Sequence, residues 1–179
     1  MAARPAILSA AVRLVDGLSR LCAWAAAAAF FVIGVIVAYE VAMRYLFAAP
    51  TRWVEETASV LQIYGVFLAA AWLVGTRAHI RISVVTALLP APARLWTARA
   101  GLVAVAAVAA VSAWFTVGLI EFSLATGQYT DSTLALPMWL LQAPVAGGLA
   151  LAALQALATV AASFAEPERL LAEADMGGA

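Results

Sequence analysis

Four long apolar runs, separated by short polar segments, constrain this 179-residue chain more than any other feature. The chain is 66% hydrophobic and only 11% charged, whereas soluble domains are roughly 45–50% apolar and about 25% charged. A membrane-spanning helix needs about 20 mostly apolar residues. Four runs meet this requirement: residues 21–43, 54–74, 97–122 and 137–163. The sequence therefore predicts an all-α integral membrane protein, a single membrane domain over residues 1–179 with four transmembrane helices.

The arginines predict which way the chain faces, because short cytoplasmic loops carry an excess of basic residues. The chain contains no lysine. Eight arginines precede the first run, follow the last, lie between the second and third or, in the case of Arg99, stand at the start of the third: Arg4, Arg13, Arg20, Arg77, Arg81, Arg94, Arg99 and Arg169. Only Arg44 and Arg52 lie on the other side. The count places both termini, including the tail at 165–179, in the cytoplasm.

Two segments outside the runs have amphipathic character. Residues 6–20 carry apolar side chains at helical spacing, with arginines and other polar residues opposite. This pattern predicts a helix lying in the cytoplasmic membrane interface, although a simple polar lead into the first span is the alternative. Residues 77–92 mix isoleucine, valine and leucine with basic residues and end at two prolines. They predict a second interfacial connection on the same side.

Ionisable residues occur only near the ends of the spans. Glu40 lies one turn before Arg44, in the order that favours a local ion pair, and we favour this pair over a role in ion translocation. Glu55 and Glu56 open the second span, where carboxylates complement the helix dipole. For these two, capping and an intersubunit contact are both open. A charge at the bilayer centre would indicate function, and none is expected there.

Packing residues are expected in the fourth span. Pro144 should remove a backbone hydrogen bond and kink the helix. Gly147 and Gly148 offer a surface on which another helix can approach closely.

The residue inventory contains no recognisable reactive site. Cys22 is the single cysteine and His79 the single histidine, so neither a disulfide nor a catalytic or metal-binding cluster can be assembled. A net charge of zero argues against nucleic-acid binding. The lack of polar groups at mid-depth argues against an autonomous pump or carrier. We expect no catalytic residues, no metal and no cofactor in this chain, and therefore no enzyme.

The residues around the second span carry a family resemblance. Arg44 begins an Arg-Tyr-Leu-Phe sequence, Trp53 precedes Glu55 and Glu56 in a W-x-E-E element, and His79 begins a His-Ile-Arg-Ile element. In this order and spacing, the segment from residue 40 to about 92 resembles the small permease subunit of tripartite ATP-independent periplasmic (TRAP) transporters. The length and the four-span layout extend the resemblance over the whole chain.

The resemblance implies a bacterial inner-membrane protein that works with two partners. One is a large permease subunit that carries the substrate and sodium sites, and the other is an extracytoplasmic protein that captures an organic acid. The small subunit would be non-catalytic and would anchor the scaffold of the large one, within the lipid bilayer. Residues expected to fix the fold or the subunit interface are Arg44, Trp53, Glu55, Glu56 and His79.

Two other functions stay open at the level of sequence. A four-span structural or assembly subunit of an unrelated complex fits the spans and the lack of polar sites equally well. A small membrane enzyme would need a nucleophile or metal site that the sequence does not supply. Tryptophans near the span ends are expected to anchor the chain at the interfaces: Trp53, Trp72, Trp96 and Trp139.

Overall fold

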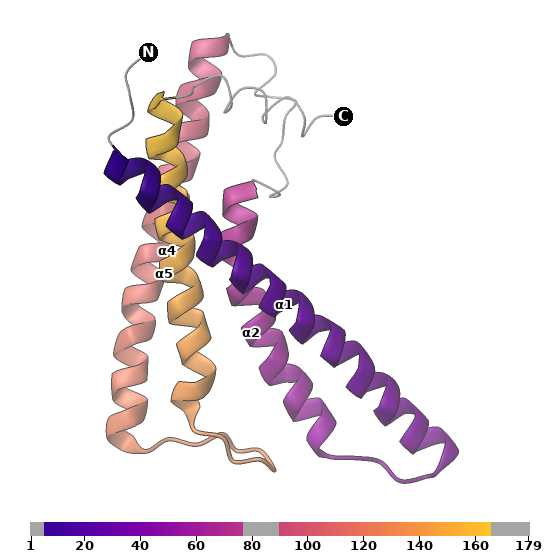
Figure 1. Cartoon of the computed structure of the whole chain (residues 1–179). Coiled ribbons are helices and arrows are strands. Elements are labelled where there is room, and N and C mark those ends of the chain that lie inside the picture. Colours follow the sequence, from indigo (N-terminus) through magenta and orange to yellow (C-terminus); the bar gives the residue numbers. More distant parts are fainter. Residues whose placement is uncertain (1–5, 77–89, 166–179) are drawn as a thin grey trace.

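Four long helices make up the computed structural model, which describes residues 6–76 and 90–165 (Figure 1). The helices are α1 (Ala6–Leu46), α2 (Trp53–Thr76), α4 (Ala91–Thr126) and α5 (Met138–Ala165). Each contains a stretch long and apolar enough to cross a membrane. The prediction of an all-α membrane protein with four spans is confirmed.

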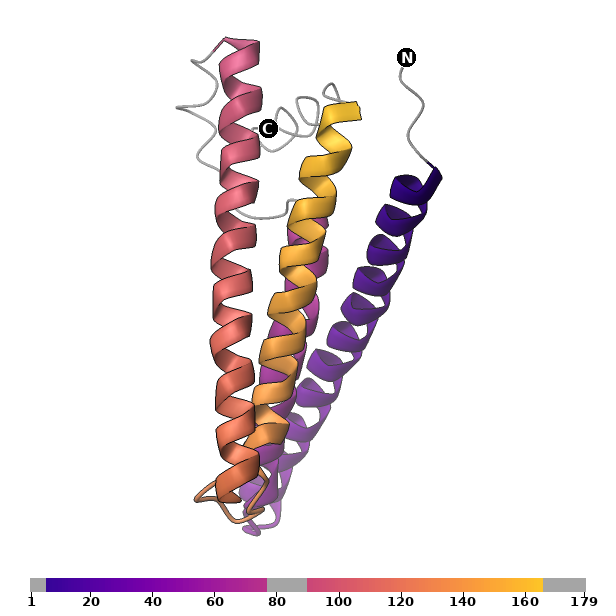
Figure 2. The ribbon, with the colours of Figure 1, turned by 90° about the vertical axis from the view of Figure 1, so that its left-hand side faces the viewer.

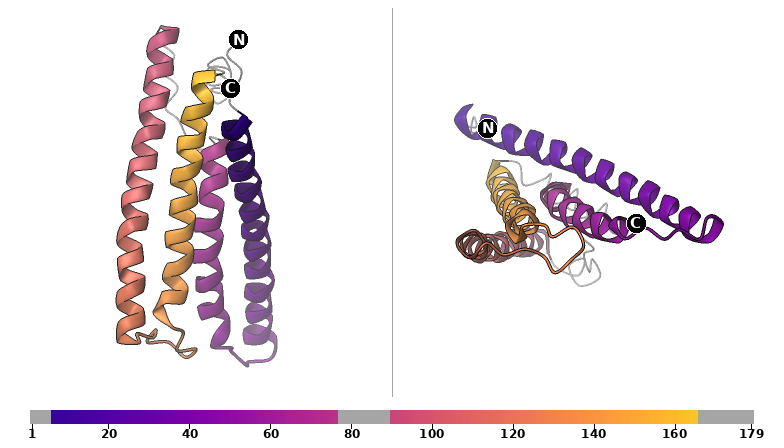
Figure 3. Two further views of the ribbon diagram at one scale, coloured as in Figure 1. Left: turned by 60° about the vertical axis from the view of Figure 1, so that its left-hand side comes forward. Right: turned by 90° about the horizontal axis from the view of Figure 1, so that it is seen from below.

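The helices form an open row. The main contacts join α1 to α2, α2 to α5 and α5 to α4, so α2 and α5 lie in the middle and α1 and α4 on the outside (Figure 3, left). The view in Figure 2 shows α4 and α1 on opposite sides of the pair α2 and α5. The outer faces of α1 and α4 are therefore left uncovered by the other described helices.

Residues 6–20 are not a separate helix, because α1 is continuous through 41 residues. At 1.5 Å per residue it measures roughly 60 Å, about twice the hydrocarbon thickness of a bilayer. Its first half meets α5, and its second half runs beside α2 (Figure 1). Leu14, Leu18 and Leu21, part of the predicted apolar stripe, are exposed, whereas Ser19 is buried against α5. The placement of this segment in the membrane plane stays a prediction.

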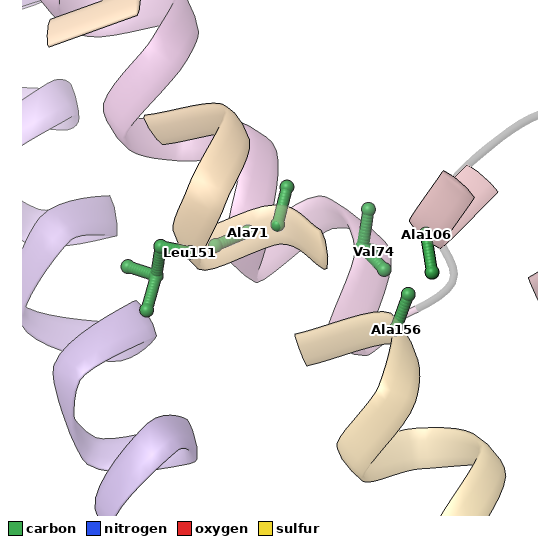
Figure 4. Close-up of a cluster of buried hydrophobic side chains, with 6 residues drawn as sticks. Ala71, Val74, Ala106, Leu151 and Ala156 are labelled. Atoms are coloured by element: carbon green, nitrogen blue, oxygen red, sulfur yellow. The ribbon is translucent and has the colours of Figure 1, made fainter. Parts of the chain in front are cut away.

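Alanine dominates the core. Among the described residues, nine of the thirteen buried apolar side chains are alanines. One cluster joins α2, α4 and α5 through Ala71, Val74, Ala106, Leu151, Ala152 and Ala156 (Figure 4). Small side chains bring helix backbones close together, which is how membrane helices gain dispersion contacts without a hydrophobic driving force.

The backbones of α2 and α5 approach each other closely at Gly148. A Cβ atom added at Gly148 would lie 2.2 Å from the carbonyl oxygen of Phe67, so only glycine fits at this crossing. A Cβ atom added at Gly147, the preceding residue, would have nothing within 4 Å. Of the predicted glycine pair, Gly148 makes the contact.

Pro144 is inside α5 and its lost hydrogen bond is replaced from α2. Proline has no N–H, so the carbonyl of Leu140, four residues earlier, lacks its usual helical donor. The hydroxyl of Tyr64 donates to that carbonyl at 2.9 Å. Such compensation is required in lipid, where no water is present to satisfy the freed carbonyl.

The connection between α4 and α5 is a hydrogen-bonded loop. Gly127 ends α4 in the left-handed conformation and its N–H donates to the carbonyl of Ser123, as expected for a helix stop. Thr130 N donates to Leu136 O at 2.8 Å, and Met138 N donates to Gln128 O at 2.9 Å. The loop is thereby closed on itself below α4 and α5.

Candidate functional site

Charged residues bracket the apolar part of the helices in two rims. In α1, residues 21–39 carry no charge between Arg20 and Glu40, and in α4 residues 100–120 carry none between Arg99 and Glu121. Each stretch measures roughly 30 Å, the thickness of the hydrocarbon core. We call Arg20 and Arg99 the basic rim, and Glu40, Glu56 and Glu121 the acidic rim. The membrane-depth part of the described helices is free of charged side chains.

Glu40 joins the end of α1 to the end of the following loop, just before α2. Its carboxylate accepts a hydrogen bond from the Nη2 of Arg44 at 2.9 Å and one from the backbone N–H of Thr51 at 3.0 Å. The hydroxyl of Thr51 also donates to it. The residue is only 8% exposed, so the carboxylate is enclosed by its partners. The predicted Glu40–Arg44 pair is confirmed, and Thr51 is a partner that sequence spacing did not reveal.

Glu56 fastens α2 to the loop between α4 and α5. Its two carboxylate oxygens accept hydrogen bonds from the backbone N–H groups of Thr133 and Leu134, at 2.7 and 2.8 Å. Ala135, the next residue, has a φ of 42°, a conformation disfavoured for residues with a Cβ atom. The carboxylate therefore holds a loop from the other half of the chain.

The remaining predicted site residues are not gathered into one site. The side chain of Arg44 pairs with Glu40 and is 59% exposed. Trp53 begins α2 and lies 6.3 Å from Tyr39 between ring centroids. Glu55 is exposed, and its backbone carbonyl accepts a hydrogen bond from the hydroxyl of Ser59 at 2.9 Å. His79 lies outside the described residues, as does the connection at 77–92 up to residue 89.

Arg99 fastens α4 to the end of α5 at the basic rim. Its Nη2 donates to the carbonyl of Ser163 at 2.9 Å, and its Nε donates to the Ser163 hydroxyl at 3.1 Å. The guanidinium lies 4.1 Å above the ring centroid of Phe164 and 5.5 Å from that of Trp96. Cation–π contact adds to the hydrogen bonds. In the sequence, Arg99 is recognisable only as a signal of membrane topology.

A buried glutamine joins α5 to α1. Gln155 is 5% exposed. Its Oε1 accepts from the hydroxyl of Ser19 at 2.9 Å, and its Nε2 donates to Oδ1 of Asp16 at 2.7 Å. A polar residue in the middle of an otherwise apolar helical run was the available sequence signal, and it was missed.

These contacts hold helices together and do not assemble a reactive centre. Within residues 6–76 and 90–165, no group of three or more histidine, cysteine and acidic residues could hold a metal ion. The polar side chains join helices and loops at the two rims. The apolar faces between the rims are exposed in the described residues. The arrangement defines the class: this is a multi-pass membrane protein, and the polar contacts described here hold its helices together.

Comparison with protein families gives the particular family. The family model described as tripartite ATP-independent periplasmic transporters, DctQ component, matches residues 33–166. The chain belongs to this family and is the small membrane subunit of a TRAP transporter, as the second-span motifs predicted. Proteins of this family work within TRAP transporters together with a larger permease and a binding protein. A search of curated proteins found no match.

Proposed function

We propose that this chain anchors the stationary scaffold of the large permease in a sodium-coupled TRAP transporter that takes up organic acids across the bacterial inner membrane. The observation that carries the proposal is the uncharged membrane-depth part of the helices. Ion-coupled carriers place polar and ionisable groups near the bilayer midplane. The substrate and sodium sites therefore belong to the partner, and this chain contributes no catalytic step and no cofactor.

The open row of helices supports the scaffold role. Exposed large apolar side chains are spread along the outer helices, on α1 at Phe31 and Val35 and on α4 at Val108 and Phe115. A contiguous exposed apolar surface in a membrane protein meets either lipid or another subunit. Arg44, Trp53 and Glu55 are exposed at the acidic-rim end, where they are available to a partner.

Purification and uptake test this proposal together. The tagged chain, isolated from its native membrane, is expected to carry one larger permease in a fixed ratio. Deleting the chain is expected to abolish sodium-driven uptake of the organic acid, and returning it is expected to restore uptake. A chain that purifies without a permease, from cells whose uptake survives the deletion, would support the alternative of a structural subunit of an unrelated complex.

Rim variants separate a scaffold from an ion site. Glu40→Gln and Glu56→Gln should change the amount of complex without changing the dependence of the remaining uptake on sodium concentration, because sodium binds to the partner. A shifted sodium dependence in either variant would place an ion site in this chain and contradict the proposal.

A further inference from the structure

A cavity lies between the first half of α1, the end of α2 and the second half of α5. Its volume is about 350 Å³, and its walls include Asp16 and Arg20 of α1, Trp72 and Thr76 of α2, and Gln155 of α5. Ligand pockets typically begin at roughly 300 Å³. The space therefore suits a small polar group of several atoms and not only a single ion.

The cavity lies at the level of the basic rim. Arg20 borders the uncharged stretch of α1 that matches the hydrocarbon core, and α2 ends at Thr76, one of the wall residues. This is the depth at which lipid headgroups lie. Exposed apolar side chains adjoin the wall residues, Leu21 after Arg20 and Leu73 after Trp72, so lipid chains have apolar surface beside the cavity.

Gln155 holds Asp16, the acidic residue of the cavity wall, in position. Because its amide is engaged by both Ser19 and Asp16, the Asp16 carboxylate is directed toward α5. The amide passes close over α2, where a Cβ atom added at Gly75 would lie 2.7 Å from Gln155 Nε2. Glycine at 75 is thus required for this arrangement.

The two charges of the cavity are not paired with each other. Aspartate and arginine four residues apart on a helix normally attract, yet no ion pair between Asp16 and Arg20 occurs in the described part of the chain. Within those same residues, Arg20 makes no hydrogen bond and the Oδ2 atom of Asp16 accepts none. One cationic and one anionic group are therefore available on the walls of the same cavity.

We propose that this cavity binds the headgroup of a zwitterionic phospholipid that carries a primary ammonium and a phosphate. Arg20 binds the phosphate through charge-assisted hydrogen bonds, and Oδ2 of Asp16 accepts from the ammonium. Trp72 packs beside the glycerol region, as interfacial tryptophans do. The site is separate from transport and goes beyond the proposed function, since it makes a defined lipid part of the structure.

Native mass spectrometry of the full-length chain, titrated with lipids of equal chain length, tests the site. Phosphatidylethanolamine should bind more tightly than phosphatidylglycerol, which lacks the ammonium, and than phosphatidylcholine, whose methylated ammonium has no N–H. Arg20→Gln and Asp16→Asn should each weaken phosphatidylethanolamine binding by about tenfold or more. The asparagine can still accept from Gln155, so the fold is kept. Arg52→Gln, which removes an exposed arginine at the other end, is the matched control and should change nothing.

Three results would overturn the proposal. Equal affinity for all three lipids in the original chain and every variant would indicate ordinary surrounding lipid. Equal binding of phosphatidylglycerol, together with no effect of Asp16→Asn, would indicate a simple anion site. Displacement of the lipid by free phosphoethanolamine at equal concentration would indicate a soluble ligand. None of these readouts depends on uptake, so failure here is distinguishable from failure of the scaffold role.

Discussion

Helices α5 and α1 lie in the same membrane-sized layer but are built for opposite environments. In the most apolar 18-residue window of each helix, 39% of the residues of α5 are buried by this chain, against 6% for α1. The buried face of α5 is mainly alanine and glycine, whereas α1 exposes leucine, phenylalanine, valine and tryptophan. Both windows are strongly apolar, and composition alone would not distinguish them.

The difference shows what apolarity means in a membrane protein. Lipid is as apolar as a protein core, so an exposed leucine costs nothing and residue size decides which faces pack. Small residues make up most of the faces by which these helices contact one another. Large residues indicate a face left for lipid or for another subunit. If this view is right, substitutions in α5 should be costly and similar ones in α1 should be tolerated.

Gly148→Ala should have the largest effect. The added methyl would overlap the Phe67 carbonyl, which is backbone and cannot rotate away. We expect α2 and α5 to separate, with a loss of roughly 4 kcal/mol or more, in the range of exceptional single substitutions. Unfolding in mixed detergent micelles measures it. Gly147→Ala is the matched control and should be within about 0.5 kcal/mol of the original chain. Equal effects of the two would refute the close crossing.

Enlarging a buried alanine should have the next largest effect. Ala156 is 0% exposed at the junction of α2, α4 and α5, and Ala156→Leu should destabilise by about 1–3 kcal/mol through overpacking. Val35→Leu on the exposed face of α1 should be nearly neutral. The same unfolding titration compares them. A neutral Ala156→Leu would show that the alanine core is loosely packed.

Tyr64→Phe should cost about 1–3 kcal/mol, because it leaves the carbonyl of Leu140 without a donor. The effect should shrink in the Pro144→Ala background, where residue 144 regains an N–H that can bond to that carbonyl. A double-mutant cycle in the unfolding free energy measures this coupling. If the cost of Tyr64→Phe is the same in both backgrounds, the hydroxyl does not replace the bond that proline removes.

Glu56→Gln should have the smallest effect. The amide keeps one acceptor for the loop N–H groups but loses the charge, so we expect a small loss of stability and faster proteolysis of the loop at 127–137. Glu55→Gln is the control, since no side-chain hydrogen bond of Glu55 is present in the described residues. Identical protease sensitivity of the two variants would show that the Glu56 carboxylate does not hold this loop.

Periodicity and length predicted much of this molecule, and long-range pairing limited the rest. The four spans and the stop at Gly127 follow from local rules, as does the ion pair of Glu40 with Arg44, four residues apart. The partners of Glu56 and Gln155 are 77 and 139 residues away along the chain, and no local rule identifies them. The continuity of α1 was not predicted, because the amphipathic pattern of residues 6–20 was interpreted as a separate helix.

Site-directed photocrosslinking in the native membrane tests the central claim most directly. Photoreactive residues at Val35 of α1 and Val108 of α4 probe the uncovered faces, and one at Ala152 of α5, which is 3% exposed, probes the enclosed face. We predict a crosslink to one protein larger than this chain from at least one uncovered face, and none from Ala152. Crosslinks only to lipid from both uncovered faces would contradict the scaffold role.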